Sequence, residues 1–233
     1  MSTVVVEVGG THLATRKRAR KPIPQRSCLV TLTCMDALYQ PNETGFDALN
    51  ELDQVDWSRL EHGYGRGVVS LGVAGGVSLA IAGDVSRSLA ALRTDSSLAI
   101  SDGLYSNICH QGTVYQATAY AVPFIAAVAA GNVPEGIRVP LLALLGDIAI
   151  GGSYVAPDGS YAGAVGDHVE VLVTESLATS MERLSTIRTP RLVALIQAIQ
   201  SLLVQSTDAR RDAVESAIDV ALTPPATPWD RRP

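Results

Sequence analysis

The amino-acid sequence predicts an all-α fold, arranged as an α-solenoid of stacked antiparallel helical hairpins. Through most of residues 46–222, apolar residues recur three and four positions apart, which is the period of an amphipathic helix. Hydrophobic residues make up 47% of the chain, mostly Ala, Val, Leu and Ile, whereas aromatic residues make up only 5%. Small and aliphatic side chains suit closely packed helices. No alternating pattern typical of strands follows residue 46.

The 233 residues divide into three predicted regions around one sizeable core. Residues 1–45 comprise a basic arm and a poorly defined segment, with a short strand or helical turn over the apolar patch 28–38. Residues 46–222 form the helical domain. The Pro-rich residues 223–233 are expected to be disordered.

Charge is distributed unevenly between the arm and the rest of the chain. The net charge is −5, and residues 1–21 contribute +4 to it, so the remaining chain carries −9. An acidic body repels phosphate backbones, which disfavours broad nucleic-acid binding. The arm is expected to be a solvated chain, with binding to an anionic surface as the alternative. Both lysines lie in the arm, and the body uses only arginine.

The first helix of the domain is predicted to begin at Asp56, which can cap the free N–H groups that follow it, and to end at Gly63 and Gly65. Its buried side is formed by Leu49, Leu52, Trp57, Leu60 and Tyr64. The glycine-rich residues 66–83 then form an insertion. Its uncharged run is shorter than the roughly 20 residues that a membrane span needs, so we expect a buried or loosely packed segment.

Further helices are predicted on both sides of a polar junction. Helical spacing at Val85, Leu89 and Leu92 is followed by a helix that Ser96 or Ser97 caps and that runs to about Cys109. Its inward residues are Leu98, Leu104 and Ile108. The helix from Tyr115 to Ala130 is expected to kink or restart at Pro123, which removes a donor and crowds the Ala119 carbonyl. The residues around Pro140 repeat the pattern around Pro123, which favours stacked hairpins.

The C-terminal part is predicted as a long loop and three helices. Residues 151–167 form the loop, a binding loop or a disordered one, and a helix then runs from His168 to about Arg188. Thr189 caps the next helix with Pro190 at its first position, and Thr207 or Asp208 caps the last. The inward residues of these two helices are Leu192, Leu195, Ile196, Ile199, Leu202 and Leu203, and then Val214, Ala217, Ile218 and Ala221.

Cysteine usage indicates a reducing compartment. The three cysteines, Cys28, Cys34 and Cys109, form an odd set without a secretory leader, so we expect reduced thiols and a cytoplasmic protein. Cys109 is expected to be a buried, inert thiol, because adjacent helical residues point about 100° apart and it would not face His110. The spacing of His62, Cys109 and His110 matches no zinc pattern, so neither a metal nor a cofactor is expected.

The polar junction within Leu104 to Ala126 is the candidate functional region. His110 is the residue there most suited to acid–base chemistry, with Asp102 or the more distant Glu61 as its orienting carboxylate. The alternative is structural, with His110 and Gln111 satisfying free groups at adjacent helix ends. The aromatic residues around it either line a concave binding face or fill seams between helices, and Tyr115 and Tyr120 are expected to be the more exposed.

Two motifs carry a family resemblance. Residues 56–65 read DWSRLEHGYG, and residues 104–124 read LYSNICHQGTVYQATAYAVPF. Over roughly residues 55–150 the chain resembles the actinobacterial HEAT-repeat-containing proteins, whose patterns are DWxxLEHAYG and LYxNIWHQGTVYxATAxAVPFL. This chain departs from them with Cys109 in place of Trp, Gly63 in place of Ala, and the insertion at 66–83.

The resemblance implies a HEAT-like α-solenoid of helical pairs that binds another macromolecule. Function is therefore predicted as non-enzymatic protein binding, as an adaptor or a toxin-neutralising immunity protein, with a basic protein as partner. The alternative is an enzyme on HEAT-like repeats that uses the His110 region, either DNA glycosylase-like or biosynthetic. The predicted binding residues are Trp57, His62, Tyr64, Tyr105, Asn107, His110, Gln111, Tyr115 and Tyr120.

Overall fold

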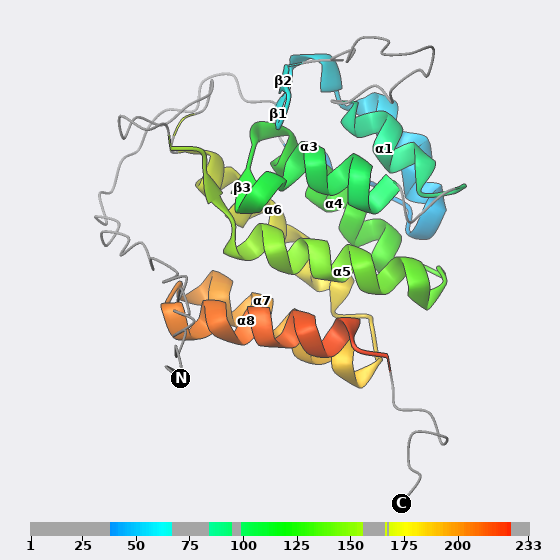
Figure 1. The fold of residues 1–233 in the computed structure, drawn as a ribbon. Helices are drawn as coiled ribbons and strands as arrows, with labels where there is room; N and C mark the ends of the chain where they lie inside the picture. The colour runs from blue at the N-terminus through cyan, green and yellow to red at the C-terminus, as the bar shows by residue number, and fades with distance from the viewer. Residues whose placement is uncertain (1–37, 67–83, 95–98, 156–165, 167, 225–233) are drawn as a thin grey trace, which may run out of the picture. The chain divides into compact units, whose positions relative to one another are not determined.

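The computed structural model describes residues 38–66, 84–94, 99–155, 166 and 168–224 (Figure 1). They belong to one compact unit, residues 37–233. The basic arm, the glycine-rich stretch, the predicted cap at Ser96 or Ser97, Leu98 and most of the Pro-rich tail lie outside the described residues. The described residues are mostly helical, which confirms the all-α prediction.

The elements alternate between long helices and short irregular turns. The helical elements are η1 (Gly45–Gln54), η2 (Trp57–Arg59), α1 (Val85–Ala91), the π-helix η3 (Ala99–Tyr105), α3 (Ser106–Ile108), η4 (His110–Gly112), α4 (Gln116–Ala130), α5 (Glu135–Ile150), α6 (His168–Leu184), α7 (Pro190–Val204) and α8 (Asp208–Leu222). The strands are β1 (Glu61–His62), β2 (Gly65–Arg66), β3 (Thr113–Val114) and β4 (Gly152–Ser153).

Helix α4 lies at the centre of the core. All its side chains from Ala117 to Ala129 are buried, because η1, α1, α5 and α6 all pack against it. A helix that is apolar on every side needs such complete covering. The small residues of the sequence allow the neighbouring helices to approach α4 closely.

Helix α4 runs without interruption through Pro123, so the predicted restart at this residue is wrong. Because proline has no N–H group, the Ala119 carbonyl four residues earlier lacks its usual helical donor. The buried Ser176 hydroxyl of α6 donates to that carbonyl at 2.6 Å. The helix therefore continues through Pro123, and the group that proline leaves without a partner is paired across the α4–α6 interface.

The end of α4 packs tightly against η1. Gly45 has a φ of +67°, and a Cβ on Gly131 would lie 2.0 Å from the Gly45 nitrogen. Arg138 of α5 donates to the carbonyls of Ala129 and Gly131 at 2.9 and 2.7 Å. Two glycines and one guanidinium group thus close the α4–α5 turn against η1.

Helices α7 and α8 pack on each other and both contact α5 (Figure 1). Pro190 occupies the start of α7 as predicted, and the Thr207 hydroxyl caps α8 by accepting from the Arg210 N–H group. The predicted inward residues are buried except Leu203 and Ala217, which are half-buried. Gly146 of α5 lets α8 approach, because a Cβ there would lie 2.7 Å from the Ile218 side chain.

The predicted helix from Asp56 is wrong. After the single turn η2, the chain forms a hairpin in which Glu61 pairs with Arg66 and His62 with Gly65. A two-residue connection is the commonest hairpin loop, and Gly65, the residue directly after it, has a φ of +122°. Tyr64 is consequently 39% exposed rather than buried, whereas Leu49 and Leu60 are buried as expected.

The helix predicted to run to about Cys109 is present, but its first part is of a different type. The π-helix η3 passes directly into α3, which ends at Ile108, and Leu104 and Ile108 are buried as expected. Thr113 then pairs in parallel with Gly152, and Val114 with Ser153. The long loop after Gly151 therefore begins as a strand, so the prediction of no strand after residue 46 is wrong at these two short pairs.

The contacts between helices do not by themselves establish the predicted stacking of hairpins, which stays a prediction. Helices α4 and α6 contact each other, as do α5 and α7, which agrees with stacking of an α4–α5 hairpin on an α6–α7 hairpin. Helix α8, however, contacts both α7 and α5. No helix in the described part of the chain is long and apolar enough to cross a membrane.

Candidate binding surface at the helical junction

The β1–β2 hairpin docks on α3 and exposes Tyr64. The Gly63 N–H donates to the Asn107 carbonyl at 2.7 Å, and a Cβ on Gly63 would lie 2.6 Å from the Ser106 carbonyl. Position 63 therefore has no room for a side chain. Docking brings the Tyr64 ring to the exposed His110 ring, with centroids 6.4 Å apart.

The parallel pairing of β3 and β4 brings a second pair of aromatic residues together. Because Val114 is opposite Ser153, Tyr115 and Tyr154 follow at equivalent positions just beyond the two strands. Neighbouring strands lie about 4.8 Å apart. Tyr154 is 48% exposed and Tyr115 is half-buried. Burial raises the pKa of Tyr115, and Cys109, Tyr154 and Tyr64 raise it further, so these groups are its neighbours.

A carboxylate that the sequence reasoning missed lies beside this surface. The Tyr105 hydroxyl donates to Asp147 Oδ2 of α5 at 2.6 Å. Burial raises the pKa of Asp147, and the Tyr105 hydrogen bond partly opposes that effect. Burial and the neighbouring Asp147 also raise the pKa of Tyr105. In the sequence, this carboxylate could have been noticed as a single acidic residue within the otherwise apolar run 139–150.

Cys109 is buried as predicted. Its exposed fraction is 4%, and burial together with the charge of Asp147 raises its pKa to about 12. A thiol with so high a pKa stays protonated at neutral pH and is a poor nucleophile. The expectation of an inert thiol is consistent with this environment.

His110 and Gln111 do not tie helix ends together in the described structure. Both are exposed, and Gln111 has a left-handed φ of 51° in the turn before β3. Within the described residues, no carboxylate hydrogen-bonds to His110, and the Asp102 side chain lies outside them. Other side chains donate hydrogen bonds to the carbonyls near these helix ends. The Thr118 hydroxyl donates to the Ile108 carbonyl at 2.6 Å, and Asn107 donates to the Gly103 carbonyl at 2.6 Å.

Three predicted binding residues are buried: Tyr120, His62 and Asn107 are 7%, 3% and 2% exposed. The expectation that Tyr120 would be among the more exposed tyrosines is therefore wrong, because α4 is covered on every side. His62 Nδ1 accepts from the Tyr64 N–H at 3.2 Å, which shapes the hairpin turn. These residues support the surface from beneath rather than form it.

Trp57 belongs to a different part of the molecule. Its indole N–H donates to the Leu52 carbonyl at 2.7 Å, and its ring contacts Phe124. It lines a shallow, open pocket of about 440 Å³ between η1, η2 and α1. The pocket is lined by Leu52, Asp53, Val55, Trp57, Asp84, Ser86, Arg87 and Ala90.

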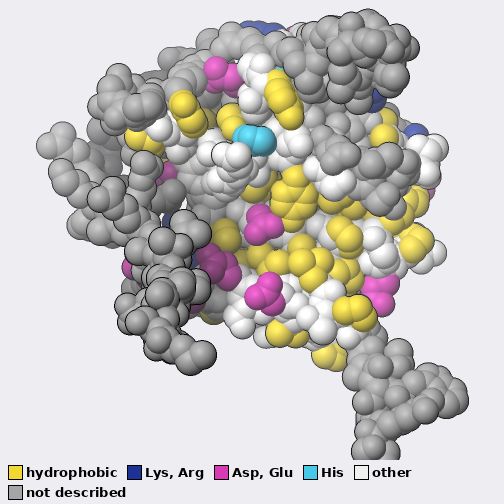
Figure 2. All heavy atoms as spheres, in the orientation of Figure 1, with side chains coloured by type: hydrophobic (Ala, Val, Ile, Leu, Met, Phe, Trp, Pro, Cys, Tyr) yellow, Lys and Arg dark blue, Asp and Glu magenta, His cyan; other side chains and the backbone are white. Residues whose placement is uncertain are grey.

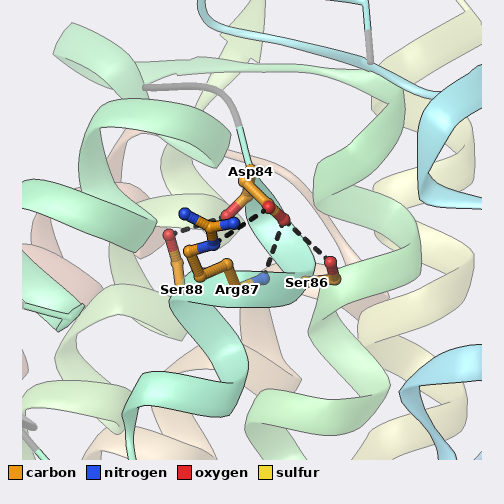
Figure 3. Close-up of polar contacts among 4 residues, drawn as sticks. All are labelled: Asp84, Ser86, Arg87 and Ser88. Carbon is orange, nitrogen blue, oxygen red and sulfur yellow. Dashed lines mark hydrogen bonds and ion pairs between the residues drawn. The ribbon is translucent and has the colours of Figure 1, made fainter. Parts of the chain in front are cut away.

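The polar groups on the α1 side of this pocket are already paired (Figure 3). Asp84 Oδ1 accepts from the Ser86 hydroxyl and from the Arg87 backbone N–H, both at 2.8 Å, and Arg87 Nε lies 3.4 Å from Oδ2. Asp84 thereby caps the start of α1. The predicted site residues thus separate, with Trp57 at this pocket and Tyr64, His110 and Tyr115 at the junction.

The molecular face that carries α5 and α8 combines apolar and acidic side chains. In Figure 2 hydrophobic side chains gather on it with Asp and Glu among them, and Lys and Arg appear only toward the edges. In the described part of the chain, seven arginines donate to backbone carbonyls: Arg93, Arg138, Arg183, Arg188, Arg191, Arg210 and Arg211. These guanidinium groups thus serve as donors to the backbone of the fold.

No protein-family model matches the chain, and no curated protein or solved structure matches it significantly. The resemblance carried by the two motifs accordingly stays a prediction. Within the described residues, no group of three or more His, Cys, Asp or Glu side chains is arranged to hold a metal ion. Arguments about function therefore rest on the junction itself.

Proposed function

We propose that this chain is a protein-binding helical module whose partner docks on the junction surface, defined as Tyr64, His110, Tyr115 and Tyr154. The observation that carries the proposal is the exposure of Tyr64 and Tyr154, at 39% and 48%, around a half-buried Tyr115. Tyrosine at a surface supplies large contact area at low entropic cost and is enriched where proteins bind each other. The partner is a protein with a basic surface, because the body is acidic.

A HEAT-like stacked array is the architecture we propose for this module. The α4–α6 and α5–α7 contacts support it, and so does the repetition of the pattern around Pro123 at Pro140. Such arrays present extended faces to macromolecular partners. An adaptor and a toxin-neutralising immunity protein are the two roles we propose for a binder of basic proteins.

An enzymatic role for His110 has less support. A general base needs an orienting group and a substrate within hydrogen-bond reach. His110 is exposed and contacts Tyr64, and no described carboxylate hydrogen-bonds to it. A DNA glycosylase-like role would also require a cationic surface to hold the phosphate backbone, whereas the body is acidic.

The proposal is tested by affinity capture from native lysate with the full chain and two sets of variants. Tyr64→Ala with Tyr154→Ala removes both exposed rings of the junction surface. Val171→Ala, at a 61% exposed position on α6, is the matched control. We expect a protein that the wild type and the control capture and that the double variant releases. Equal capture by all three proteins would overturn the assignment to this surface.

A further inference from the structure

The junction surface combines aromatic rings with carboxylates. Tyr115 and Tyr154 occupy equivalent positions of a parallel pair, and the Tyr64–His110 ring pair lies beside Tyr115. Glu170 of α6 reaches the same strand, because its Oε1 accepts from the Ser153 N–H at 2.8 Å. Aromatic faces and acidic groups attract the same class of ligand, a cation.

Asp147 supplies a second carboxylate close to the rings. It lies near Cys109, whose pKa it raises, and Cys109 in turn is a neighbour of Tyr115. Tyr105 occupies Asp147 Oδ2, and Oδ1 accepts no hydrogen bond from the described residues. The Asp147 side chain is half-buried, so it is not fully enclosed by the described residues.

The arginine at the end of α5 is committed to other groups. Arg211 of α8 donates to the Ile150 carbonyl at 2.6 Å and to the Ser206 hydroxyl at 3.4 Å. Its guanidinium group therefore serves the end of α5. The carboxylates of Asp147 and Glu170 form no ion pair within the described residues, so the surface keeps a local negative charge beside its rings.

We propose that the junction surface binds an arginine side chain of the partner, with the guanidinium stacked on Tyr115 and Tyr154 and its charge met by Asp147 and Glu170. This inference rests on the proposed protein-binding function and names the group that is recognised. A guanidinium is planar, is weakly hydrated and carries five N–H donors, so it satisfies rings and carboxylates together. The compact, strongly hydrated ammonium of lysine does so less well.

The test uses small probes rather than an unidentified partner. Nα-acetyl-arginine methylamide is titrated into protein carrying ¹³C-labelled tyrosine rings, with the signals assigned by single Tyr→Phe variants. The matching citrulline compound has nearly the same shape without the charge. We expect saturable shifts at Tyr64, Tyr115 and Tyr154 with the arginine probe and much smaller shifts with citrulline. Tyr39, whose ring stacks on Phe124, serves as the internal reference.

Charge variants sharpen this test. Asp147→Asn keeps an acceptor for Tyr105 and removes the charge, so it should weaken probe binding by about two- to fivefold, as for an exposed charge pair. Glu182→Gln, at an exposed position late in α6, makes the same charge change and should leave binding unchanged. Equal shifts with arginine and citrulline, or an unchanged affinity in Asp147→Asn, would overturn the inference.

The outcomes separate this inference from the proposed function. If a partner is captured through Tyr64 and Tyr154 but the arginine probe does not discriminate, arginine recognition is wrong and protein binding stands. If the probe binds as expected and capture does not depend on those tyrosines, the cation site stands and its assignment to the proposed partner is wrong.

Discussion

Single buried hydrogen bonds decide how the central helix is built. The sequence shows that Pro123 leaves a carbonyl of α4 without its helical donor. It does not show which group replaces that donor, because Ser176 is more than fifty residues away and on another helix. The same holds for Asp147, whose role depends on the approach of Tyr105 from η3. The aromatic residues of the junction could be identified because they lie close together in the sequence. Their exposure could not be predicted, because it depends on which distant segments pack over them.

Ser176→Ala should destabilise the protein by about 1–3 kcal/mol, because it leaves the buried Ala119 carbonyl without a donor. Ser180→Ala is the matched control on the same helix, since the buried Ser180 hydroxyl donates to the Ser176 carbonyl of its own helix. Denaturant unfolding measures both free energies. An equal loss of unfolding free energy in the two variants would show that the hydrogen bond between α4 and α6 does not stabilise the protein more than a bond within one helix.

Asp147→Asn should change how stability depends on pH. The folded-state pKa of Asp147 is raised above its usual 3.8, so the favourable contribution of the protonated group is lost as pH rises through that higher value. The variant should therefore gain stability relative to wild type between acidic and neutral pH. Melting temperatures across this range measure the gain, with Glu182→Gln as the control. A difference in melting temperature that stays constant across this pH range would contradict the raised pKa of Asp147.

Cys109 should react slowly while the protein is folded. In a Cys28→Ser, Cys34→Ser variant it is the remaining thiol, and its raised pKa and burial both suppress the thiolate. We expect alkylation by iodoacetamide at mildly alkaline pH to be at least about a hundredfold slower than in denaturant. Similar rates in the two conditions would mean that the thiol is accessible.

Elements whose signals are local were predicted well, and elements that depend on docking were not. Helices α6, α7 and α8 have apolar stripes of their own, α7 begins with Pro190, and the Thr207 hydroxyl caps α8, so their positions follow from nearby residues. The β1–β2 hairpin was mistaken for a helix because its form depends on contacts with Ser106 and Asn107 more than forty residues later. The β3–β4 pair likewise joins segments that the whole α4–α5 hairpin separates.

Gly131→Ala should strongly destabilise the α4–α5 turn. The added Cβ would lie 2.0 Å from the Gly45 nitrogen, so the backbone of η1 must move away from α4. Gly136→Ala is the matched control in the first turn of α5, where a Cβ meets nothing within 4 Å. The control should gain up to about 1 kcal/mol from helix propensity. Thermal unfolding of both variants measures the contrast, and similar melting temperatures would argue against the close approach.

At the scale of the whole molecule, the choice of arginine over lysine has a structural basis. The described arginines end mostly on carbonyls at helix ends and turns, where a guanidinium can bond two acceptors at once, as Arg138 and Arg183 do. No Asp or Glu side chain among the described residues is fully buried. The sequence predicted the negative charge of the body, but it could not locate the face on which apolar and acidic side chains gather, because that face joins separate helices.

The central claim is that the junction surface binds a basic protein through its exposed tyrosines. The most direct measurement is the affinity of the captured partner for wild type, for Tyr64→Ala with Tyr154→Ala, and for Val171→Ala, determined by calorimetry at two salt concentrations. Loss of two exposed aromatic anchors should weaken binding by at least about tenfold, and higher salt should weaken wild-type binding further. The control should match wild type. An unchanged affinity in the double variant would contradict the claim.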